Sequence, residues 1–255
     1  MISKNQIKLI QALHLKKNRD SQGLFIVEGI KLVTEFLEDE GVVVRQLFAL
    51  APYLQKHLAL LEKRNIAYAE VDAEELKKIS LQTTPNQALA VVQKKEQFLT
   101  PELLTSQLSL YLDDIRDPGN LGTIIRMADW FGIRQVICSR STTELYNPKT
   151  LQASMGAVLR VNVIYLDFAE LLPSLKGVPV YGAVLSGNNI YRSALRTGMI
   201  VIGNEANGIS EAVLQHVTEP ITIPAAGQNG SESLNAANAC AIICSEFHRQ
   251  LNYNA

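Results

Sequence analysis

Two apolar runs constrain the fold of this 255-residue chain more than any other feature. They lie at residues 178–184 and 199–202, and neither alternates between apolar and polar positions. Strands of this kind are covered on both faces, as in a parallel sheet between two layers of helices. The same region holds four further strand-like runs, at 108–112, 135–138, 158–165 and 221–223. Helical patterns separate these runs, so the pattern predicts an α/β domain with a mostly parallel sheet.

The first 95 residues have the pattern of a second, smaller α/β unit. Strand-like runs occur at 24–27, 42–49, 66–71 and 88–93, with short helical patterns between them. The stretch that follows is polar, contains Pro101 and has weak periodicity, as is typical of a domain boundary. We therefore expect an N-terminal domain at 1–95, a linker at 96–107 and a C-terminal domain at 108–255.

Charge and cysteine content narrow the class of protein. The net charge is −1, so any nucleic-acid partner must be bound by local positive charge. Cys138, Cys240 and Cys244 form no disulfide framework, and we expect them to be small core residues in a reduced, cytoplasmic protein without a bound metal. The first residues lack the apolar stretch of a signal peptide, and no run is long enough to predict a membrane span.

Ligands of such sheets bind beyond the carboxyl ends of the strands. The candidate positions are the loops after Leu112, Val184, Ile202 and Ile223. The first loop, 113–122, predicts a turn in which Asn120 caps a helix whose N-terminus favours an anion. Arg126 lies about a turn and a half further along the helix, and its side chain could reach the same anion site. Taken alone, this loop is better explained as a simple capped turn.

Two further loops carry unusual sequences. In the loop 203–210, Gly203 predicts a close backbone approach, either to another chain segment or to a ligand. The loop after Ile223 enters a helix at Ser233, with Ser231 as a plausible cap and with Ser233 and Asn235 presenting polar groups. Each of these loops taken alone also fits an ordinary connection.

Taken together, the three loops resemble motifs 1, 2 and 3 of the SpoU (TrmH-like) family of RNA ribose methyltransferases, in the SPOUT superfamily. The resemblance covers residues 108–248. The stretch 23–29 is similar to an N-terminal substrate-binding domain of many family members, which shares a ribosomal-protein-like, RNA-binding fold. The resemblance implies a deep trefoil knot at the C-terminal end of the chain, S-adenosylmethionine as cofactor, and a homodimer with the active site near its interface.

The resemblance also implies roles for individual residues. The expected catalytic residues are Arg126, Asn120, Ser233, Asn235 and Glu205. The expected cofactor contacts are Leu185, Gly203, Ile223 and Leu234. An arginine is almost always protonated, so Arg126 suits a phosphate clamp better than a base. We expect Glu205 to organise its loop rather than transfer protons. The loop 225–233 is slightly longer than the commonest family form, which could shift cofactor contacts.

RNA contacts are expected from local basic clusters, although such clusters also occur on ordinary solvated faces. The candidates are Lys16, Lys17, Arg19 and Arg116. The sequence thus predicts an enzyme that methylates a ribose 2′-hydroxyl in ribosomal or transfer RNA. Two alternatives share the fold: a catalytically silent RNA-binding relative and a base-modifying SPOUT methyltransferase. A Rossmann-type enzyme is disfavoured because its glycine-rich fingerprint does not follow the first strand of the sheet.

Overall fold

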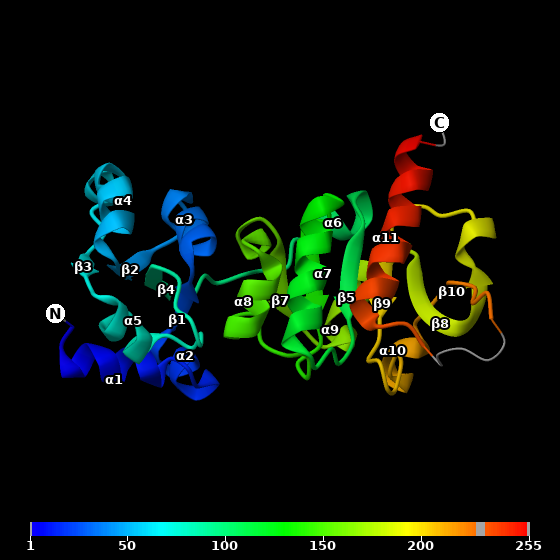
Figure 1. The fold of residues 1–255 in the computed structure, drawn as a ribbon. Helices are drawn as coiled ribbons and strands as arrows, with labels where there is room; N and C mark the ends of the chain where they lie inside the picture. Colours follow the sequence, from blue (N-terminus) through cyan, green and yellow to red (C-terminus); the bar gives the residue numbers. More distant parts are fainter. Residues whose placement is uncertain (1, 228–232, 254–255) are drawn as a thin grey trace. The chain divides into compact units, whose positions relative to one another are not determined.

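The chain forms two compact units (Figure 1). A computed structural model describes residues 2–227 and 233–253. The first unit holds Met1–Glu96 together with Tyr146–Leu159, and the second holds Gln97–Leu145 together with Arg160–Ala255. The two units are therefore interleaved along the sequence.

A four-stranded sheet forms the centre of the first unit. Its order is β1 (Leu24–Glu28), β4 (Ala88–Gln93), β2 (Val44–Ala49) and β3 (Tyr68–Glu70). β4 runs antiparallel to both of its neighbours, whereas β2 and β3 are parallel. All four strands coincide with the apolar runs of the sequence to within a few residues.

Helices cover both faces of this sheet. They are α1 (Lys4–Ala12), α2 (Lys16–Gln22), α3 (Ile30–Glu38), α4 (Ala51–Lys63), α5 (Ala73–Ile79) and α8 (Pro148–Ser154). Phe25 and Val27 share a core with α3 and α4, whereas Ile26 between them packs with α1 and α5. This alternation arises because successive side chains of a strand point to opposite faces.

The position of α8 differs from the expected domain limits. Its Leu151 is 1% exposed and lies in the core with α3 and α4. The Tyr146 ring stands 4.4 Å from the ring of Phe25. A segment expected to belong to the C-terminal domain is thus part of the first unit, because its apolar side chains are buried against β1 and α3.

The second unit is built on a six-stranded, fully parallel sheet, as the unbroken apolar runs predict. Its order is β10 (Glu219–Thr222), β8 (Val180–Asn189), β9 (Met199–Ile202), β5 (Ser109–Leu112), β6 (Gln135–Cys138) and β7 (Asn162–Tyr165). The helices of this unit are α6 (Pro101–Ser106), α7 (Pro118–Trp130), α9 (Phe168–Leu171), α10 (Glu211–Leu214) and α11 (Ala236–Tyr253).

The two faces of this sheet are covered differently. Leu104 of α6 and Phe168 of α9 pack with Tyr111 and Val201 in one core. α7 and α11 pack side by side, as Figure 1 shows. α6 lies inside the stretch expected to be a linker, and its fully buried Leu104 makes this stretch part of the second unit.

β8 continues well beyond the apolar run that predicted it. Pro220 of β10 pairs with Gly182, but the next residue, Ile221, pairs with Asn188, so the register shifts sharply. Gly187 lies against β10, where an added Cβ would stand 2.5 Å from the Ile221 carbonyl carbon. The bend brings the end of β10 beside Leu185, whose carbonyl accepts a hydrogen bond from Thr222 Oγ1 at 3.2 Å.

The three cysteines are buried and free, as expected for core residues. Burial raises the pKa of the Cys138 and Cys240 thiols. In the described ranges, no set of three or more histidine, cysteine, aspartate or glutamate side chains is arranged to bind a metal ion. Of the helices in the described part of the chain, none is both long and apolar enough to cross a membrane.

Candidate functional site

Side chains from three loops meet at the carboxyl ends of β5 and β9. Asn235, just before α11, donates its Nδ2 to Asn120 Oδ1 at 3.0 Å. Asn120, in the first turn of α7, donates its own Nδ2 to the carboxylate of Glu205, in the loop after β9. The structure therefore joins three of the five residues expected to be catalytic, across sequence separations of 85 and 115 residues.

The cap of α7 differs from the expected one. Asp117, not Asn120, is the N-cap, and its Oδ1 accepts from the backbone N–H groups of Gly119 at 2.7 Å and Asn120 at 3.0 Å. Aspartate and asparagine cap helices about equally well, so the local sequence did not discriminate between them. The correction matters because it leaves the Asn120 side chain available for Glu205 and Asn235.

The start of α11 also requires a correction. The helix begins at Ala236, not Ser233, and Asn235 Oδ1 accepts from the backbone N–H groups of Ala237 at 3.0 Å and Asn238 at 3.3 Å. Both ends of the Asn235 carboxamide are thus engaged, which fixes its orientation. Ser233 is exposed two residues earlier. Ser231, the other expected cap, lies outside the described residues.

Arg126 stands apart from this chain of hydrogen bonds. It lies on α7, a turn and a half beyond Asn120, and its side chain is exposed. Its guanidinium forms no hydrogen bond or ion pair with another residue of the described ranges 2–227 and 233–253. A guanidinium in this state keeps its donors available for an external anion.

The sequence left open whether the backbone at Gly203 approaches another chain segment or a ligand. An added Cβ would stand 2.2 Å from the Gly208 carbonyl carbon and 2.3 Å from the Ile209 nitrogen. The close approach is therefore to another segment of the same loop. The backbone of Gly208 pairs with that of Asn204 in both directions, at 3.0 and 2.8 Å, which closes the loop.

The other three expected cofactor contacts are apolar side chains: Leu185 lies within β8, Ile223 follows β10, and Leu234 precedes α11. Leu185 is 78% exposed and Leu234 is 47% exposed. Ile223 is half-buried and follows Thr222, whose hydroxyl contacts the Leu185 carbonyl. The structure thus brings Thr222, the residue before Ile223, beside Leu185.

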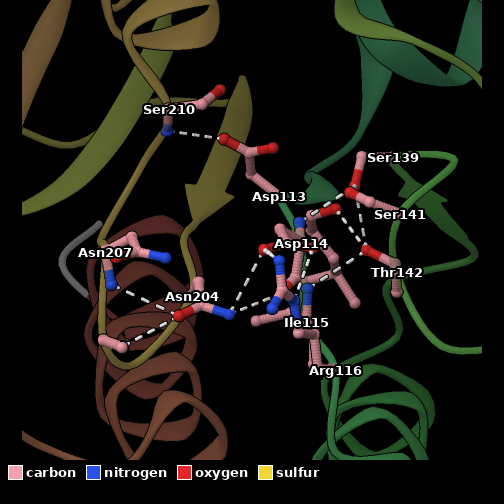
Figure 2. A network of polar contacts seen from close by, with 12 residues as sticks. Asp113, Asp114, Ile115, Arg116, Ser139, Ser141, Thr142, Asn204, Asn207 and Ser210 are labelled. Atoms are coloured by element: carbon pink, nitrogen blue, oxygen red, sulfur yellow. Dashed lines mark hydrogen bonds and ion pairs between the residues drawn. The ribbon is translucent and has the colours of Figure 1, made fainter.

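A network that the sequence did not indicate links the loops after β5 and β9 (Figure 2). Asn204 donates its Nδ2 to the Asp114 carbonyl at 2.8 Å, and Asp113 Oδ2 accepts from the Ser210 backbone N–H at 2.7 Å. Asp113 is 5% exposed, and Asp114 has a positive φ of 59°. The available signal was two consecutive aspartates directly after a buried strand.

Hydroxyl groups hold the same loop from its other side. Ser139 Oγ accepts from the Asp114 backbone N–H at 2.9 Å. Thr142 Oγ1 accepts from the Ile115 backbone N–H at 3.2 Å and donates to the Leu112 carbonyl at 3.0 Å. The backbone from β5 to α7 is therefore fixed at successive residues.

The candidate RNA-binding residues have different surroundings. Lys16 and Lys17 are exposed on α2. Arg116 is exposed and forms an ion pair with Asp114, with Nη2 and Oδ2 3.0 Å apart. Arg19 corrects the expectation, since it is 3% exposed and donates to the carbonyls of Leu13 and His14 at 2.7 and 2.8 Å. Its guanidinium stabilises the end of α1 and is not presented to solvent.

Two family models match successive stretches of the chain. The model of the SpoU rRNA Methylase family matches residues 107–245, and that of the MRM3-like substrate binding domain matches residues 4–90. The 23S rRNA (guanosine(2553)-2'-O)-methyltransferase RlmP of Bacillus subtilis is 31% identical to this chain. That match covers 94% of this chain and 95% of the relative.

Two solved structures are similar over nearly the whole length. A TrmH-family protein from Porphyromonas gingivalis is 38% identical, with a TM-score of 0.85, and the match covers 98% of this chain and 99% of that one. An AdoMet-bound rRNA methyltransferase from Sinorhizobium meliloti is 27% identical, with a TM-score of 0.86, over 98% and 97% of the two chains.

Proposed function

The chain belongs to the SpoU rRNA methylase family, and we propose on that premise that it methylates a ribose 2′-hydroxyl of ribosomal RNA, with S-adenosylmethionine as methyl donor. The observation that carries the proposal is the chain of hydrogen bonds from Asn235 through Asn120 to Glu205. The Bacillus subtilis relative acts on 23S rRNA, which favours ribosomal over transfer RNA as the substrate.

The residues at the sheet edge suit the cofactor. Exposed Leu185 and half-buried Ile223 offer apolar contacts for an adenosine moiety, and Leu234 adds a further exposed apolar side chain. Gly203 contributes backbone atoms of a closed, well-packed loop. When bound, S-adenosylmethionine supplies a methyl group already activated by its positively charged sulfur, so the protein has mainly to align the acceptor.

Arg126 acts on the RNA side of this arrangement. Its exposed guanidinium binds the phosphate beside the target ribose, since a planar fork of donors matches two phosphate oxygens. Holding that phosphate sets the 2′-hydroxyl against the methyl group. With S-adenosylmethionine bound, its methyl group would pass from sulfur to the 2′-oxygen, S-adenosylhomocysteine would be left, and the hydroxyl proton would pass to water.

Glu205, Asn120, Asn235 and Ser233 organise the reaction centre. The Glu205 side chain accepts a hydrogen bond from Asn120, which suits an anchoring role better than proton transfer. Asn120 and Asn235 are held in one orientation by this anchor and by the start of α11. Ser233, exposed two residues before Asn235, offers a hydroxyl to the ribose.

The proposal includes a trefoil knot and a homodimer, with the active site near the interface. The bend of β8, the return of β10 to pair with it and the packing of α11 on α7 are compatible with a knotted C-terminal segment. The exposed position of Arg126 is compatible with a site completed by a second copy. The proposal places the enzyme in the cytoplasm, together with its ribosomal RNA substrate.

Each unit offers residues for contact with the RNA. Lys16 and Lys17 are exposed on α2, and Arg116 presents most of its side chain to solvent in the second unit. These residues contact phosphates and position the RNA without reading its sequence.

Transfer of labelled methyl groups tests the proposed function. The protein is incubated with labelled S-adenosylmethionine and, separately, with unmodified ribosomal RNA or transfer RNA, and the products are digested to nucleosides and identified by mass spectrometry. We expect the label in one 2′-O-methylated nucleoside of ribosomal RNA. Label in transfer RNA would overturn the substrate, and a methylated base or no transfer would overturn the reaction.

A further inference from the structure

The loop that carries Glu205 is tied down at two points. At its start, Asn204 Nδ2 donates to the Asp114 carbonyl at 2.8 Å. At its end, the Ser210 backbone N–H donates to Asp113 Oδ2 at 2.7 Å. Two consecutive residues at the end of β5 thus hold both ends of one loop after β9, as Figure 2 shows.

Asn204 uses its carboxamide in two directions. While Nδ2 reaches Asp114, Oδ1 accepts from the backbone N–H groups of Ala206 at 2.8 Å and Asn207 at 3.2 Å. These contacts lie on either side of Glu205 in the sequence. The conformation of the residue between them is therefore constrained on both sides.

The surrounding backbone leaves the loop little other freedom. Gly203 packs directly on Gly208 and Ile209, and Asn204 and Gly208 pair through both backbone groups. In this closed loop the Glu205 carboxylate meets Asn120 and so holds the start of α7. The position of Glu205 depends on where Asn204 attaches the loop to Asp114.

We propose that Asn204 is a positioning residue for the reaction, which acts by setting Glu205 against Asn120. This inference rests on the proposed function, because its main readout is methyl transfer. Asparagine suits the role because its side chain has a donor and an acceptor at opposite sides of one planar group. An aspartate could replace the acceptor but not the donor. It would also place a negative charge beside the Asp114 carboxylate, whose Oδ2 lies 3.4 Å from Asn204 Nδ2.

The Asn204→Asp variant therefore loses the hydrogen bond to the Asp114 carbonyl but keeps an oxygen that can accept from the Ala206 and Asn207 backbone N–H groups. We expect kcat to fall on the order of 100-fold, as a displaced catalytic group can cause, with the KM for RNA little changed. Asn207→Asp is the matched control, because it makes the same chemical change on an exposed side chain of the same loop, and we expect near-normal kcat. Equal kcat in the two variants would overturn the inference.

A double-mutant cycle separates positioning from a general effect on stability. If Asn204 acts through Glu205, then Asn204→Asp slows the Glu205→Gln variant far less than it slows the wild type. Independent, additive losses in kcat would contradict this route. Thermal unfolding of every variant checks the fold, and Asn204→Ala, which removes the donor without adding a charge, replaces any Asn204→Asp protein that does not fold.

Amide hydrogen exchange of the cofactor-free protein provides a readout that does not depend on catalysis. We expect faster exchange across 203–210 in Asn204→Asp than in Asn207→Asp, because the tie to Asp114 is lost. Unchanged exchange would overturn the inference even if the enzyme is active. A wild type that transfers no methyl group would instead overturn the proposed function, while the exchange result would still report on the tie.

Discussion

Asn120 and Arg126 lie on the same helix, α7, but differ in their contacts. Asn120 is engaged at both ends of its carboxamide, by Glu205 and by Asn235. The Arg126 guanidinium is exposed and forms no hydrogen bond or ion pair within the described ranges. An engaged side chain is already oriented, whereas an exposed arginine acquires its orientation only when a ligand binds.

Replacing Arg126 tests the phosphate clamp. We expect Arg126→Ala to lower kcat by about 100-fold or more, since a charge-assisted contact to the reacting RNA is lost. The Kd for S-adenosylmethionine, measured by calorimetry, should stay near the wild-type value. Arg134→Ala, another exposed arginine of the same unit, is the control. Near-normal turnover of Arg126→Ala would remove this residue from the mechanism.

At the scale of elements, the start of α11 serves both stability and the site. Asn235 caps the helix through Oδ1 and holds Asn120 through Nδ2. A single side chain therefore couples the closing helix to α7. The two roles use different atoms and can be separated by substitution.

Two variants of Asn235 separate them. Asn235→Asp keeps a capping oxygen but loses the donor to Asn120, so we expect near-normal stability with reduced methyl transfer. Asn235→Ala loses both, and the free energy of unfolding should also fall by about 1 kcal/mol. Denaturant unfolding and kcat are measured on both proteins. Full activity of Asn235→Asp would show that its bond to Asn120 is dispensable.

The middle of α11 carries an acid-sensitive anchor. Glu246 is 6% exposed and accepts from Arg249 Nη2 and Gln250 Nε2, each at 2.7 Å. Gln250 also binds the loop before β9, through the Leu195 backbone N–H at 3.0 Å. The hydrogen bond from Arg249, helped by that from Gln250, holds the pKa of Glu246 below its ordinary value of 4.5, against the opposing effect of burial.

This lowered pKa has a defined consequence for stability. The unfolded chain binds the proton more readily than the folded one, so the contribution is complete above about pH 4.5 and is lost as the pH falls through the folded pKa. In the wild type, the midpoint temperature of unfolding should fall as the pH drops below this value. We expect a smaller fall in Glu246→Gln, which has no carboxylate to protonate. Glu102→Gln, on the exposed surface of α6, is the control. Parallel pH profiles for the wild type and Glu246→Gln would contradict the assignment.

For the whole molecule, a net charge of −1 means that RNA must be bound by local charge. Lys16 and Lys17 on α2 are the exposed candidates in the first unit. Phosphate contacts release counterions, so each contact adds to the salt dependence of binding.

Salt dependence therefore tests this surface. The double variant Lys16→Ala/Lys17→Ala should bind RNA more weakly and reduce the slope of log K against log salt by roughly 1.4–1.8, the value for two lost phosphate contacts. The control is Lys56→Ala/Lys63→Ala, which removes the same charge from α4. This helix covers one face of the sheet, whereas α1 and α5 cover the opposite face. If both double variants show the same slope, α2 does not contact the RNA.

The sequence by itself determined the sheets and the class of protein. Unbroken apolar runs predicted the parallel sheet because strands buried on both faces tolerate few polar residues. The loops at the carboxyl ends predicted Asn120, Glu205 and Asn235, and their combination identified the family. These features are readable because they depend on local pattern and on residues that occur together.

Only the tertiary structure decided which of several equivalent local choices is used. Asp117 and Asn235 cap their helices, Arg19 is buried, and α8 packs in the first unit. The tie between Asn204 and Asp114 spans 90 residues of sequence. Aspartate, asparagine and serine have nearly equal capping preferences, and an arginine suits either a carbonyl or a phosphate. Such choices depend on partners that are brought near only by folding, so local sequence does not distinguish them.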